Sequence, residues 1–321
     1  MYNVIIPMNR LKYHVSIVIP NFNGAQLLER NLPKVIASAN AYSMDVELIV
    51  VDDGSTDKSV SITENIILKN GNLKLIQHEK NKGFASSVNT GVAAASGEIV
   101  VLLNTDVIPE TDFLKPLLVN FTDEKVFAVG CLDRSIEGDG VVERGRGEAY
   151  WRRGLLIHRR GEVNKKDTFW VSGGSGAFRK NIWESLSGMD ELYSPYYWED
   201  IDLSYRAQKA GYKVLFEPDS IVVHRHEDGS VKKNYSSLQT TKIAYRNQFI
   251  FIWKNITDTK LVLSHVLWFF VHLIRHAMLL DLAYYLGLAL AVGRLKLIIK
   301  ARLGAKKTAK LSDSQLMHYS Q

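Results

Sequence analysis

The chain of 321 residues has a single cysteine, Cys131. One cysteine cannot form a disulfide within the chain, and it excludes a zinc site built from four thiolates. We therefore expect the protein to work in a reducing compartment. The first 14 residues lack the continuous apolar core of a signal peptide, because proline, asparagine and basic side chains interrupt them. With 46% hydrophobic and 23% charged residues, the composition is that of a globular protein and excludes wholesale disorder.

Acidic residues are missing from one basic stretch near the end of the chain. Between positions 294 and 310 the basic residues are Arg294, Lys296, Lys300, Arg302, Lys306, Lys307 and Lys310. The net charge of the chain is +6, so this stretch accounts for more than all of it. A basic tail next to apolar sequence favours an anionic membrane surface, and we expect no nucleic-acid partner.

The C-terminal part of the chain lacks an apolar run of about 18 charge-free residues, the length expected of a membrane-spanning helix. Residues 261–274 form an apolar run that contains two histidines, and residues 277–292 form a second that contains Asp281. Their aromatic residues favour membrane interfaces. We expect amphipathic helices that lie on the cytoplasmic face of a membrane. A packed helical subdomain or an interface between two copies of the chain is the alternative.

Four apolar segments predict the fold of the first half of the chain. They cover residues 15–20, 46–51, 73–77 and 98–103, and helix-length stretches separate them. Strands that are apolar on both faces predict a mainly parallel sheet flanked by helices, which is a Rossmann-like α/β fold. Apolar residues recur at helical spacing over 84–95 and 203–210, and glycines follow both predicted helices.

Polar residues follow three of these strands at the point where each strand ends. They are Pro20-Asn21-Phe22-Asn23-Gly24, Asp52-Asp53-Gly54-Ser55-Thr56-Asp57 and Asn104-Thr105-Asp106. Ligands of open parallel sheets bind outside the carboxyl ends of the strands. A carboxylate there can accept a hydrogen bond from a pyrimidine N–H, and another can hold a divalent metal that bridges two phosphates. Turns and helix caps also favour these residue types.

Two further segments could lie against a ligand. Asn81-Lys82-Gly83-Phe84 precedes a predicted helix, and the first amides of a helix attract phosphate. Asn89, within that helix, could reach a ribose or remain solvated. The run Gly173-Gly174-Ser175-Gly176-Ala177 allows a backbone to approach a ligand closely, or forms a flexible turn.

Candidates for proton transfer and metal binding lie further along the chain. Tyr196-Tyr197-Trp198-Glu199-Asp200-Ile201-Asp202 opens a predicted helix, where the helix dipole favours acids. The flanking rings exceed what capping requires, and a carboxylate held there could deprotonate a hydroxyl. His224 follows a predicted strand and could add an imidazole to carboxylates at a metal, or have a structural role.

The chain resembles family 2 glycosyltransferases of the GT-A fold over residues 14–226. The resemblance rests on the order and spacing of VSIVIPNFNG, VVDDGSTD, NKGFASSVNTG, VVLLNTD, SGGSGAF, YYWEDIDLSYRAQKAGYKV and VVHRH. Within the family, it points to the rhamnosyltransferases and galactofuranosyltransferases of bacterial polysaccharide synthesis. It implies a GT-A domain over residues 14–235, after an extension over residues 1–13 and before a helical, membrane-associating region over residues 236–321.

The resemblance implies a role for each matching position. Asp200 is the general base, with Glu199 beside it. Asp106 and His224 hold Mg²⁺ or Mn²⁺. The nucleotide sugar lies against Pro20, Asn21, Asn23, Asp52, Asp53, Asn81, Gly83, Asn89, Asn104 and Thr105, and either Asp52 or Asp53 contacts the base. The acceptor lies against Gly174, Ser175, Gly176 and Trp198. Asn104 replaces the usual aspartate, so the metal would be held mainly through the diphosphate.

These roles predict a metal-dependent, inverting transfer from a nucleoside-diphosphate sugar to an acceptor hydroxyl. dTDP-rhamnose is the first choice of donor, and a glycan or polyprenyl-linked saccharide is the expected acceptor. Six arginines between positions 144 and 160 could hold the pyrophosphate of such an acceptor, or be solvated. A homo-oligomer is compatible with the sequence.

Two other functions compete with this one. A nucleotidyltransferase would need basic residues after the first strand, and residues 20–24 contain none. A non-catalytic nucleotide-sugar-binding scaffold on the membrane would not need the complete set of Asp106, Asp200 and His224.

Overall fold

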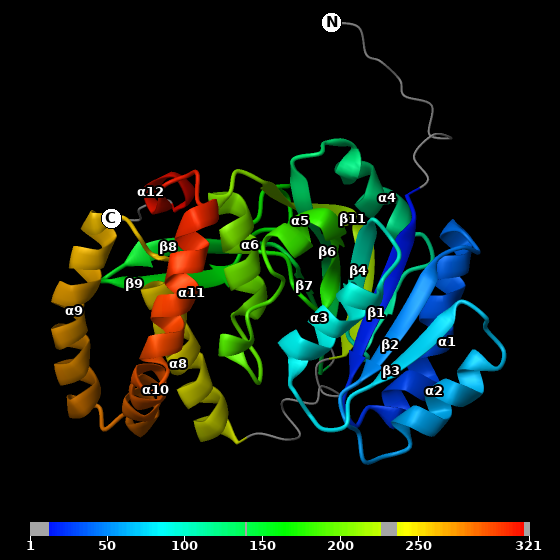
Figure 1. Ribbon diagram of the computed structural model, residues 1–321, viewed down its shortest axis with the longest axis horizontal. Coiled ribbons are helices and arrows are strands. Elements are labelled where there is room, and N and C mark those ends of the chain that lie inside the picture. Colours follow the sequence, from blue (N-terminus) through cyan, green and yellow to red (C-terminus); the bar gives the residue numbers. More distant parts are fainter. Residues whose placement is uncertain (1–12, 139, 226–235, 318–321) are drawn as a thin grey trace, which may run out of the picture.

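The computed structural model describes residues 13–138, 140–225 and 236–317. Within them, a twisted sheet with its helices forms one half of the molecule, and a group of C-terminal helices forms the other (Figure 1). Most of the expected N-terminal extension and the expected boundary at residue 235 lie outside the described residues.

The four predicted strands are confirmed, each to within one residue of its expected ends. The strands of the main sheet are β1 Val15–Asn21, β2 Glu47–Asp52, β3 Leu73–Gln77, β4 Ile99–Leu103, β5 Val107–Pro109, β6 Val126–Glu137, β7 Gly140–Arg144, β10 Ser175–Arg179 and β11 Lys213–Arg225. Their order is β3-β2-β1-β4-β10-β6-β11-β5, with β7 paired to β6. The strands β8 Gly147–Arg152 and β9 Leu155–Arg160 form a separate hairpin.

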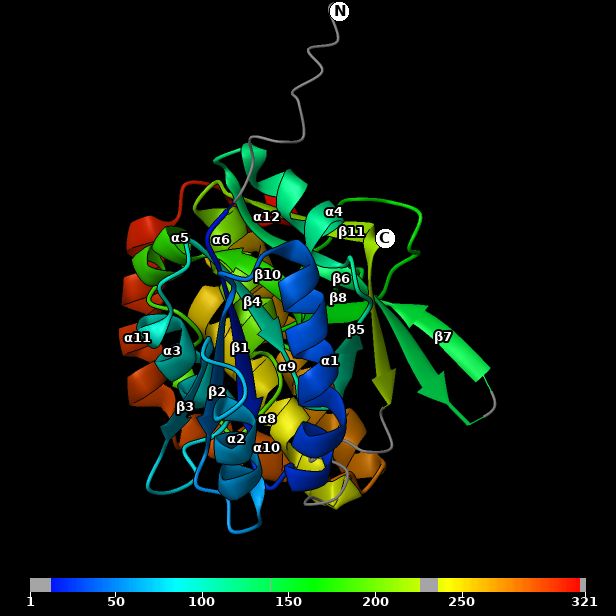
Figure 2. The same ribbon diagram turned by 90° about the vertical axis from the view of Figure 1, so that its right-hand side faces the viewer.

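The sheet is mainly parallel, as the sequence predicts, but not throughout. β1, β2, β3, β4, β6 and β11 run in one direction, whereas β5, β7 and β10 run the opposite way. The antiparallel β10 lies between β4 and β6 and brings the glycine-rich segment to the centre of the sheet. Figure 2 shows β7 projecting from the edge of the body.

Helices cover both faces of the sheet. They are α1 Ala25–Tyr42, α2 Ser59–Ile67, α3 Phe84–Ala94, α4 Leu114–Val119, α5 Lys180–Ser185 and α6 Glu199–Lys209, with short 3-10 turns at Asn120–Thr122 and Glu191–Tyr193. Ile17 and Ile19 of β1 share a core with α1, whereas Val18 between them shares a core with α3. Because both faces are covered, successive side chains of a central strand are all buried.

The C-terminal helices pack on the half of the molecule that carries α6. They are α8 Ser237–Asn255, α9 Thr259–Met278, α10 Leu282–Val292, α11 Leu295–Thr308 and α12 Asp313–Leu316. A third hydrophobic core joins Phe249 and Phe251 of α8 to Trp151 of the hairpin and to Ile201 and Tyr205 of α6. The predicted helical region therefore exists, and it shares a core with the helix that was expected to carry the general base.

α9 corrects one expectation from the sequence. The apolar run extends into a helix of 20 residues that is long and apolar enough to cross a membrane by length and composition. α10 and α11 pass the same test only as a pair bent by 68°. Lys260 and Arg275 limit the charge-free run to residues 261–274, but both lie near the ends of the helix, where long basic side chains can reach water.

Candidate active site

The carboxyl ends of β1, β2 and β4 meet at one edge of the sheet, where β10 begins. Asn21 at the end of β1 is paired with Asp52 at the end of β2. Leu103 at the end of β4 is paired with Ser175 at the start of β10. The polar segments that follow the three strands therefore share one rim, as expected of ligand-binding residues in an open sheet.

Asn21 and Asp52 are bonded to each other at this rim. Asn21 Nδ2 donates to Asp52 Oδ1 across 2.7 Å, and Asp52 Oδ2 accepts from the amide of Ser55 across 2.9 Å. Asn21 Oδ1 is buried and has no hydrogen-bond partner among the described residues. Buried polar atoms are nearly always paired, so this oxygen is a candidate acceptor for a ligand N–H or O–H group.

Asn23 and Asp53 shape the neighbouring loops. Asn23 Oδ1 accepts from the amide of Thr56 across 2.8 Å, which joins the first loop to the second. Asp53 accepts from the amides of Lys82 and Gly83 across 2.9 and 2.8 Å, and lies 2.7 Å from His78 Nδ1. Asp52 and Asp53 both stabilise loops, so this geometry does not select one of them. That one of the two contacts a base stays a prediction.

The segment from Asn81 to Gly83 forms the turn before α3. Gly83 has φ +92°, a backbone conformation that favours glycine. Asn81 is exposed on this turn. Pro20 lies in β1, opposite Val51 of β2. The carbonyl of Thr105 accepts a hydrogen bond from Asn31 Nδ2 across 2.8 Å.

Asn89 has a different role from the predicted ribose contact. Its Nδ2 donates to the carbonyl of Met189 across 2.8 Å, and its Oδ1 accepts from the amide of Met189 across 3.0 Å. These two bonds fix the loop after α5 against α3. The geometry therefore supports a structural role for Asn89 and does not support the predicted ribose contact.

His224 lies between two carboxylates. Its Nε2 is 3.2 Å from Asp106 Oδ2, and its Nδ1 is 3.0 Å from Asp133 Oδ2. Burial alone would lower the pKa of His224, but its hydrogen bonds with Asp106 and Asp133 raise that pKa to about 9. A carboxylate on the second ring nitrogen is the usual way to orient a histidine that binds metal.

Asp133 is a residue that sequence reasoning missed. It lies in β6 beside Val222 of β11, two positions before His224. The only sequence signal was an acid within an otherwise apolar strand, at Val129-Gly130-Cys131-Leu132-Asp133. No spacing rule connects it to His224, because 91 residues separate the two.

Asp106 and His224 could hold a divalent cation only with help from a ligand. No group of three His, Cys, Asp or Glu side chains in the part of the chain that the structure describes is arranged to hold a metal. Mg²⁺ is commonly bound through one or two carboxylates together with water and substrate phosphates. An oxygen donor and an imidazole within 3.2 Å of each other fit such a partial site.

Gly173 and Gly174 connect this pair to the candidate base. The amide of Gly173 donates to Asp200 Oδ2 across 3.4 Å, and the carbonyl of Gly174 accepts from the amide of Asn104 across 2.9 Å. A Cβ on Gly174 would lie 2.6 Å from the Asn104 side-chain amide, so a larger residue would displace that amide. The loop therefore brings Asp200 and the segment from Asn104 to Asp106 together.

Gly176 does not share this position. It lies within β10, paired with Leu102 and Gly130, and an added Cβ would lie 2.2 Å from Val171. Gly176 therefore allows close packing inside the sheet. The predicted contact of Gly176 with an acceptor is not supported by this geometry, whereas Gly174 and Ser175 line a cavity described below.

Glu199 and Asp200 are adjacent acids that open α6, and Glu199 is buried whereas Asp200 is partly exposed. Burial raises the pKa of Glu199, and the neighbouring charge of Asp200 raises it further. Burial also raises the pKa of Asp200, although hydrogen bonds from the amides of Ile201 and Gly173 oppose the shift. Glu199 Oε2 is buried without a hydrogen-bond partner among the described residues. A carboxylate with a raised pKa is suited to proton transfer near neutral pH.

The loop before these acids is strained and held by Asn247 of α8. Tyr197 and Trp198 have φ of 71° and 78°, which costs energy in residues other than glycine. Asn247 Nδ2 donates to the carbonyls of Tyr193, Tyr196 and Tyr197 across 3.1, 3.0 and 2.7 Å. Sequence reasoning missed Asn247, since it lies in a helix that was assigned to membrane association.

The predicted contact of Trp198 with an acceptor is not supported by its position. Its side chain is buried, and its ring lies 4.9 Å from the ring of His158 and 5.3 Å from that of Phe251. Trp198 therefore anchors the start of α6 in the third core. Its neighbour His158, which the sequence analysis did not select, lines the cavity instead.

A cavity of about 250 Å³ opens beside the metal-binding candidates. It is lined by Asn104, Asp133, Arg144, Gly145, Arg146, His158, Arg159, Arg160, Trp170, Ser172, Gly174, Ser175 and His224. This cavity unites predicted donor, metal and acceptor residues. Asn21, Asp52 and Asp53 lie outside its lining, on the part of the rim nearer to β3.

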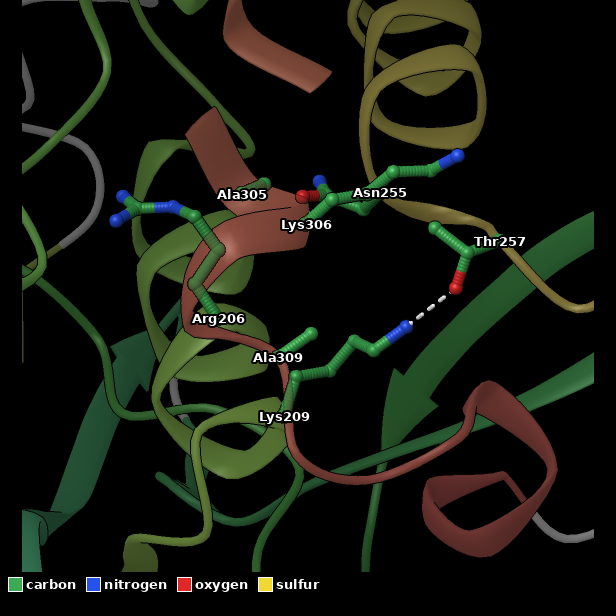
Figure 3. A pocket seen from close by; sticks show the side chains of 7 residues that line it. All are labelled: Arg206, Lys209, Asn255, Thr257, Ala305, Lys306 and Ala309. Carbon is green, nitrogen blue, oxygen red and sulfur yellow. Dashed lines mark hydrogen bonds between the residues drawn. The ribbon is translucent and has the colours of Figure 1, made fainter. Parts of the chain in front are cut away.

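A second cavity, between α6, α8 and α11, is too small for a ligand. Its volume is about 10 Å³, which is at the lower limit for one water molecule. Figure 3 shows Lys209 crossing it from α6 to the hydroxyl of Thr257, 2.8 Å away. This contact belongs to the attachment of the C-terminal helices to α6.

Solved structures share this fold at low sequence identity. GalNAc-T7, solved with UDP, GalNAc and Mn²⁺, has a TM-score of 0.62 at 20% identity, over 77% of this chain and 49% of its own. The mannosyltransferase PcManGT from Pyrobaculum calidifontis, solved with GDP-Man and Mn²⁺, has a TM-score of 0.58 at 20% identity, over 93% of this chain and 81% of its own. Both are GT-A structures, so the predicted fold is confirmed.

Related sequences agree with the fold. The pre-mycofactocin glycosyltransferase of Mycobacterium tuberculosis is 31% identical over 66% of this chain and 43% of its own length, so the chain spans less than half of that relative. The O-antigen chain rhamnosyltransferase RfbN of Salmonella typhimurium is 25% identical over 66% of each. The family model described as Glycosyl transferase family 2 matches residues 16–186, more than half of the 321 residues. The chain belongs to glycosyl transferase family 2.

Proposed function

We propose that the protein transfers a glycosyl group from a nucleoside-diphosphate sugar to an acceptor hydroxyl, with inversion of configuration. One observation carries the proposal. Gly173 bonds to Asp200 while the adjacent Gly174 bonds to Asn104, so the candidate base and the candidate metal segment meet at two consecutive residues. Transfer needs these two functions on either side of the reacting carbon.

Asp200 is the base in this proposal, and Glu199 is its protonated neighbour. Asp200 is partly exposed, whereas Glu199 is buried and its pKa is raised by burial and by the charge of Asp200. A neutral Glu199 removes a repulsive charge, so Asp200 can accept the acceptor proton. The acceptor oxygen displaces the diphosphate directly, without a covalent glycosyl-enzyme intermediate, so the configuration inverts.

A divalent cation, Mg²⁺ or Mn²⁺, would be held by Asp106 and His224 together with the donor diphosphate. Such an ion stabilises the charge that develops on a departing diphosphate. His224 must bind it through the unprotonated Nε2, and Asp133 keeps the ring oriented by bonding to Nδ1. Asn104 contributes a neutral amide. A second carboxylate in its place would add a negative charge beside the metal.

We propose dTDP-rhamnose as donor and a bacterial cell-surface polysaccharide as the product, on the basis of the similarity to RfbN over two-thirds of both chains. The two solved structures were obtained with UDP and with GDP-Man, so other nucleotides belong in any test.

Association with the cytoplasmic face of a membrane is supported by α9. One side of α9 bonds to the hairpin through His265 and His272, which lie 2.7 and 2.8 Å from the carbonyls of Gly154 and Arg153. The opposite side exposes apolar residues at helical spacing, namely Leu263, Val266, Leu267, Phe270, Val271, Ile274 and Met278. A helix bonded to the protein along one side is suited to lying on a membrane surface.

A panel of nucleotide sugars tests the proposed function. The full chain is mixed with dTDP-rhamnose, UDP-galactofuranose, UDP-galactose, UDP-glucose or GDP-mannose, with Mn²⁺ or with EDTA. We expect thermal stabilisation and slow hydrolysis with one donor, only in Mn²⁺. Binding without hydrolysis, in both wild type and Asp200→Asn, would point to a non-catalytic scaffold. Release of pyrophosphate from a nucleoside triphosphate and a sugar phosphate would point to a nucleotidyltransferase.

A further inference from the structure

One wall of the cavity is basic, and it lies away from the strands that would hold a nucleoside. Arg144 and Arg146 come from the end of β7 and the segment that follows it, and Arg159 and Arg160 come from β9. β7 pairs with β6, beyond β10 in the sheet order, and β9 belongs to the separate hairpin. Asn21, Asp52 and Asp53 lie at the ends of β1 and β2, on the other side of β4. The basic wall therefore lies in the same cavity as His224, away from the residues expected to hold the nucleoside.

The arginines of this wall differ in how far they are neutralised. Arg146 is buried and pairs with Glu148 and Asp167 across 2.8 and 2.7 Å, so it stabilises the wall itself. Arg159 shares Glu148, 3.0 Å away, with Arg146.

The remaining two arginines differ from each other. Arg144 pairs with Glu137 across 2.7 Å. Arg160 is exposed and forms no ion pair within the described ranges. Among the described residues that line the cavity, Asp133 is the one acid, and it is already bonded to His224. Arg159 bonds to Glu148 through Nε and Nη2, which leaves its Nη1 for an anion, whereas Arg160 leaves its whole guanidinium group. These planar groups match phosphate oxygens.

The hairpin that carries these arginines is attached to α9 at its other end. Its turn, Arg153-Gly154, accepts hydrogen bonds from the two α9 histidines, and the Arg153 guanidinium lies 5.6 Å from the ring of Trp268. Gly154 has φ +75°, and an added Cβ would lie 2.8 Å from Trp268, so this docking requires glycine. A strand advances about 3.4 Å per residue, so the six residues of β9 span about 20 Å from α9 to Arg160.

We infer that the acceptor carries a phosphate or diphosphate group, which Arg159 and Arg160 bind while the acceptor hydroxyl reaches Asp200. The inference rests on the proposed glycosyl transfer and names the chemical class of its acceptor. An acceptor linked through diphosphate to a long lipid would use both ends of the hairpin, the basic wall and the apolar face of α9. A soluble sugar phosphate would use only the basic wall, so the experiment must separate these two sources.

The test measures anion binding by the full chain without divalent metal, so that no cation captures the probe. Inorganic pyrophosphate and geranyl diphosphate are titrated while the fluorescence of the chain is followed, since Trp170 lines the cavity. Charge-assisted hydrogen bonds contribute enough that we expect Arg159→Gln and Arg160→Gln each to weaken binding about tenfold or more. Arg152→Gln is the matched control, because Arg152 is an exposed arginine of the same hairpin outside the cavity lining.

The outcomes separate the possibilities. Tighter binding of geranyl diphosphate than of pyrophosphate would show that the apolar tail contributes to binding, and it supports the lipid-linked source. Equal binding of the two supports the soluble source. No binding by wild type, or weakening of the same size in Arg152→Gln, would overturn the inference. Displacement of bound pyrophosphate by UDP, with no effect of Arg160→Gln, would also overturn it by assigning the anion to the donor site. Donor hydrolysis by the wild type tests the proposed function separately.

Discussion

Lys209, at the C-terminal end of α6, lies 2.6 Å from Asp313, 104 residues later in the chain. Both side chains are almost fully buried, with 7% and 0% exposed. The other oxygen of Asp313 accepts from the amide of Asp258, 2.7 Å away, where α9 begins. One carboxylate therefore joins the helix that opens with Asp200, the start of the candidate membrane helix and the end of the described chain.

We expect Asp313→Asn to lower the free energy of unfolding by about 3–5 kcal/mol, because it leaves the buried charge of Lys209 without its partner. Asp123→Asn is the matched control, since Asp123 pairs with Lys213 across 2.7 Å but both side chains are exposed. That change should have no measurable effect, because water screens an exposed pair. Urea denaturation of the two variants checks the prediction, and equal losses would contradict it.

Asp200→Asn should lower turnover by about two orders of magnitude or more, while the KM for the donor changes little. Glu199→Gln should lower it much less, because burial raises the pKa of Glu199 and glutamine resembles the neutral acid. Steady-state hydrolysis of the donor identified by the panel gives both values. If the two variants were reversed in effect, Glu199 would be the base.

Asp133→Asn should raise the apparent dissociation constant for Mn²⁺ by about 10–100-fold, because the carboxylate on Nδ1 orients His224. Titration of Mn²⁺ in the presence of nucleoside diphosphate, followed by electron paramagnetic resonance, measures it without requiring turnover. Asp112→Asn serves as the control, as Asp112 is exposed. An unchanged affinity would restrict Asp133 to a structural role.

Glu47 predicts how stability depends on pH. Burial alone would raise the pKa of Glu47, but hydrogen bonds from Lys74, Ser16 and Ser96 lower it to about 2. Because the folded-state pKa lies below the ordinary value near 4.5, the stabilisation is complete above about pH 5 and is lost as the pH falls towards 2.

The matching variant is Glu47→Gln. It should lose up to about 3 kcal/mol at pH 7 and progressively less below pH 4.5, since the wild type then loses the same contribution. Denaturant curves from pH 7 to pH 3 measure the difference. A gap that stays constant with pH would show that the charge of Glu47 is not what stabilises the fold.

Leu267→Glu with Phe270→Glu should abolish flotation with anionic vesicles. The two side chains are 71% and 62% exposed, and burying each in lipid contributes about 1.5–3 kcal/mol. Leu68→Glu is the control, because Leu68 is 84% exposed after α2, in the half of the molecule away from α9. If the double variant instead turned a dimer into a monomer, the apolar face would be an interface between copies of the chain.

Several features of the site could be predicted from the sequence. The rim formed by Asn21, Asp52 and Asn104 follows from local patterns, because each residue directly ends an apolar strand, and parallel strands end at the same edge. The start of α6 at Glu199 and Asp200 also follows, since acids favour the first turn of a helix.

Three of the predicted ligand contacts are not supported by the fold, because distant neighbours occupy these residues. Asn89 bonds to Met189, Gly176 packs against Val171, and Trp198 is buried against Phe251. In each case the residue type suited both roles. The choice between them was made by a segment that is adjacent only in the folded chain.

The parallel half of the sheet, the helices that cover it and the order of the family motifs could be predicted from local patterns, since these depend on residues close together in the chain. The contact of Asp133 with His224, the bonds from Asn247 to the strained loop before Asp200, and the attachment of the C-terminal helices to α6 by Asp313 became visible in the folded chain alone. A buried charge or a strained loop is stabilised by whichever partner the fold brings within hydrogen-bond distance. No local pattern specifies that partner.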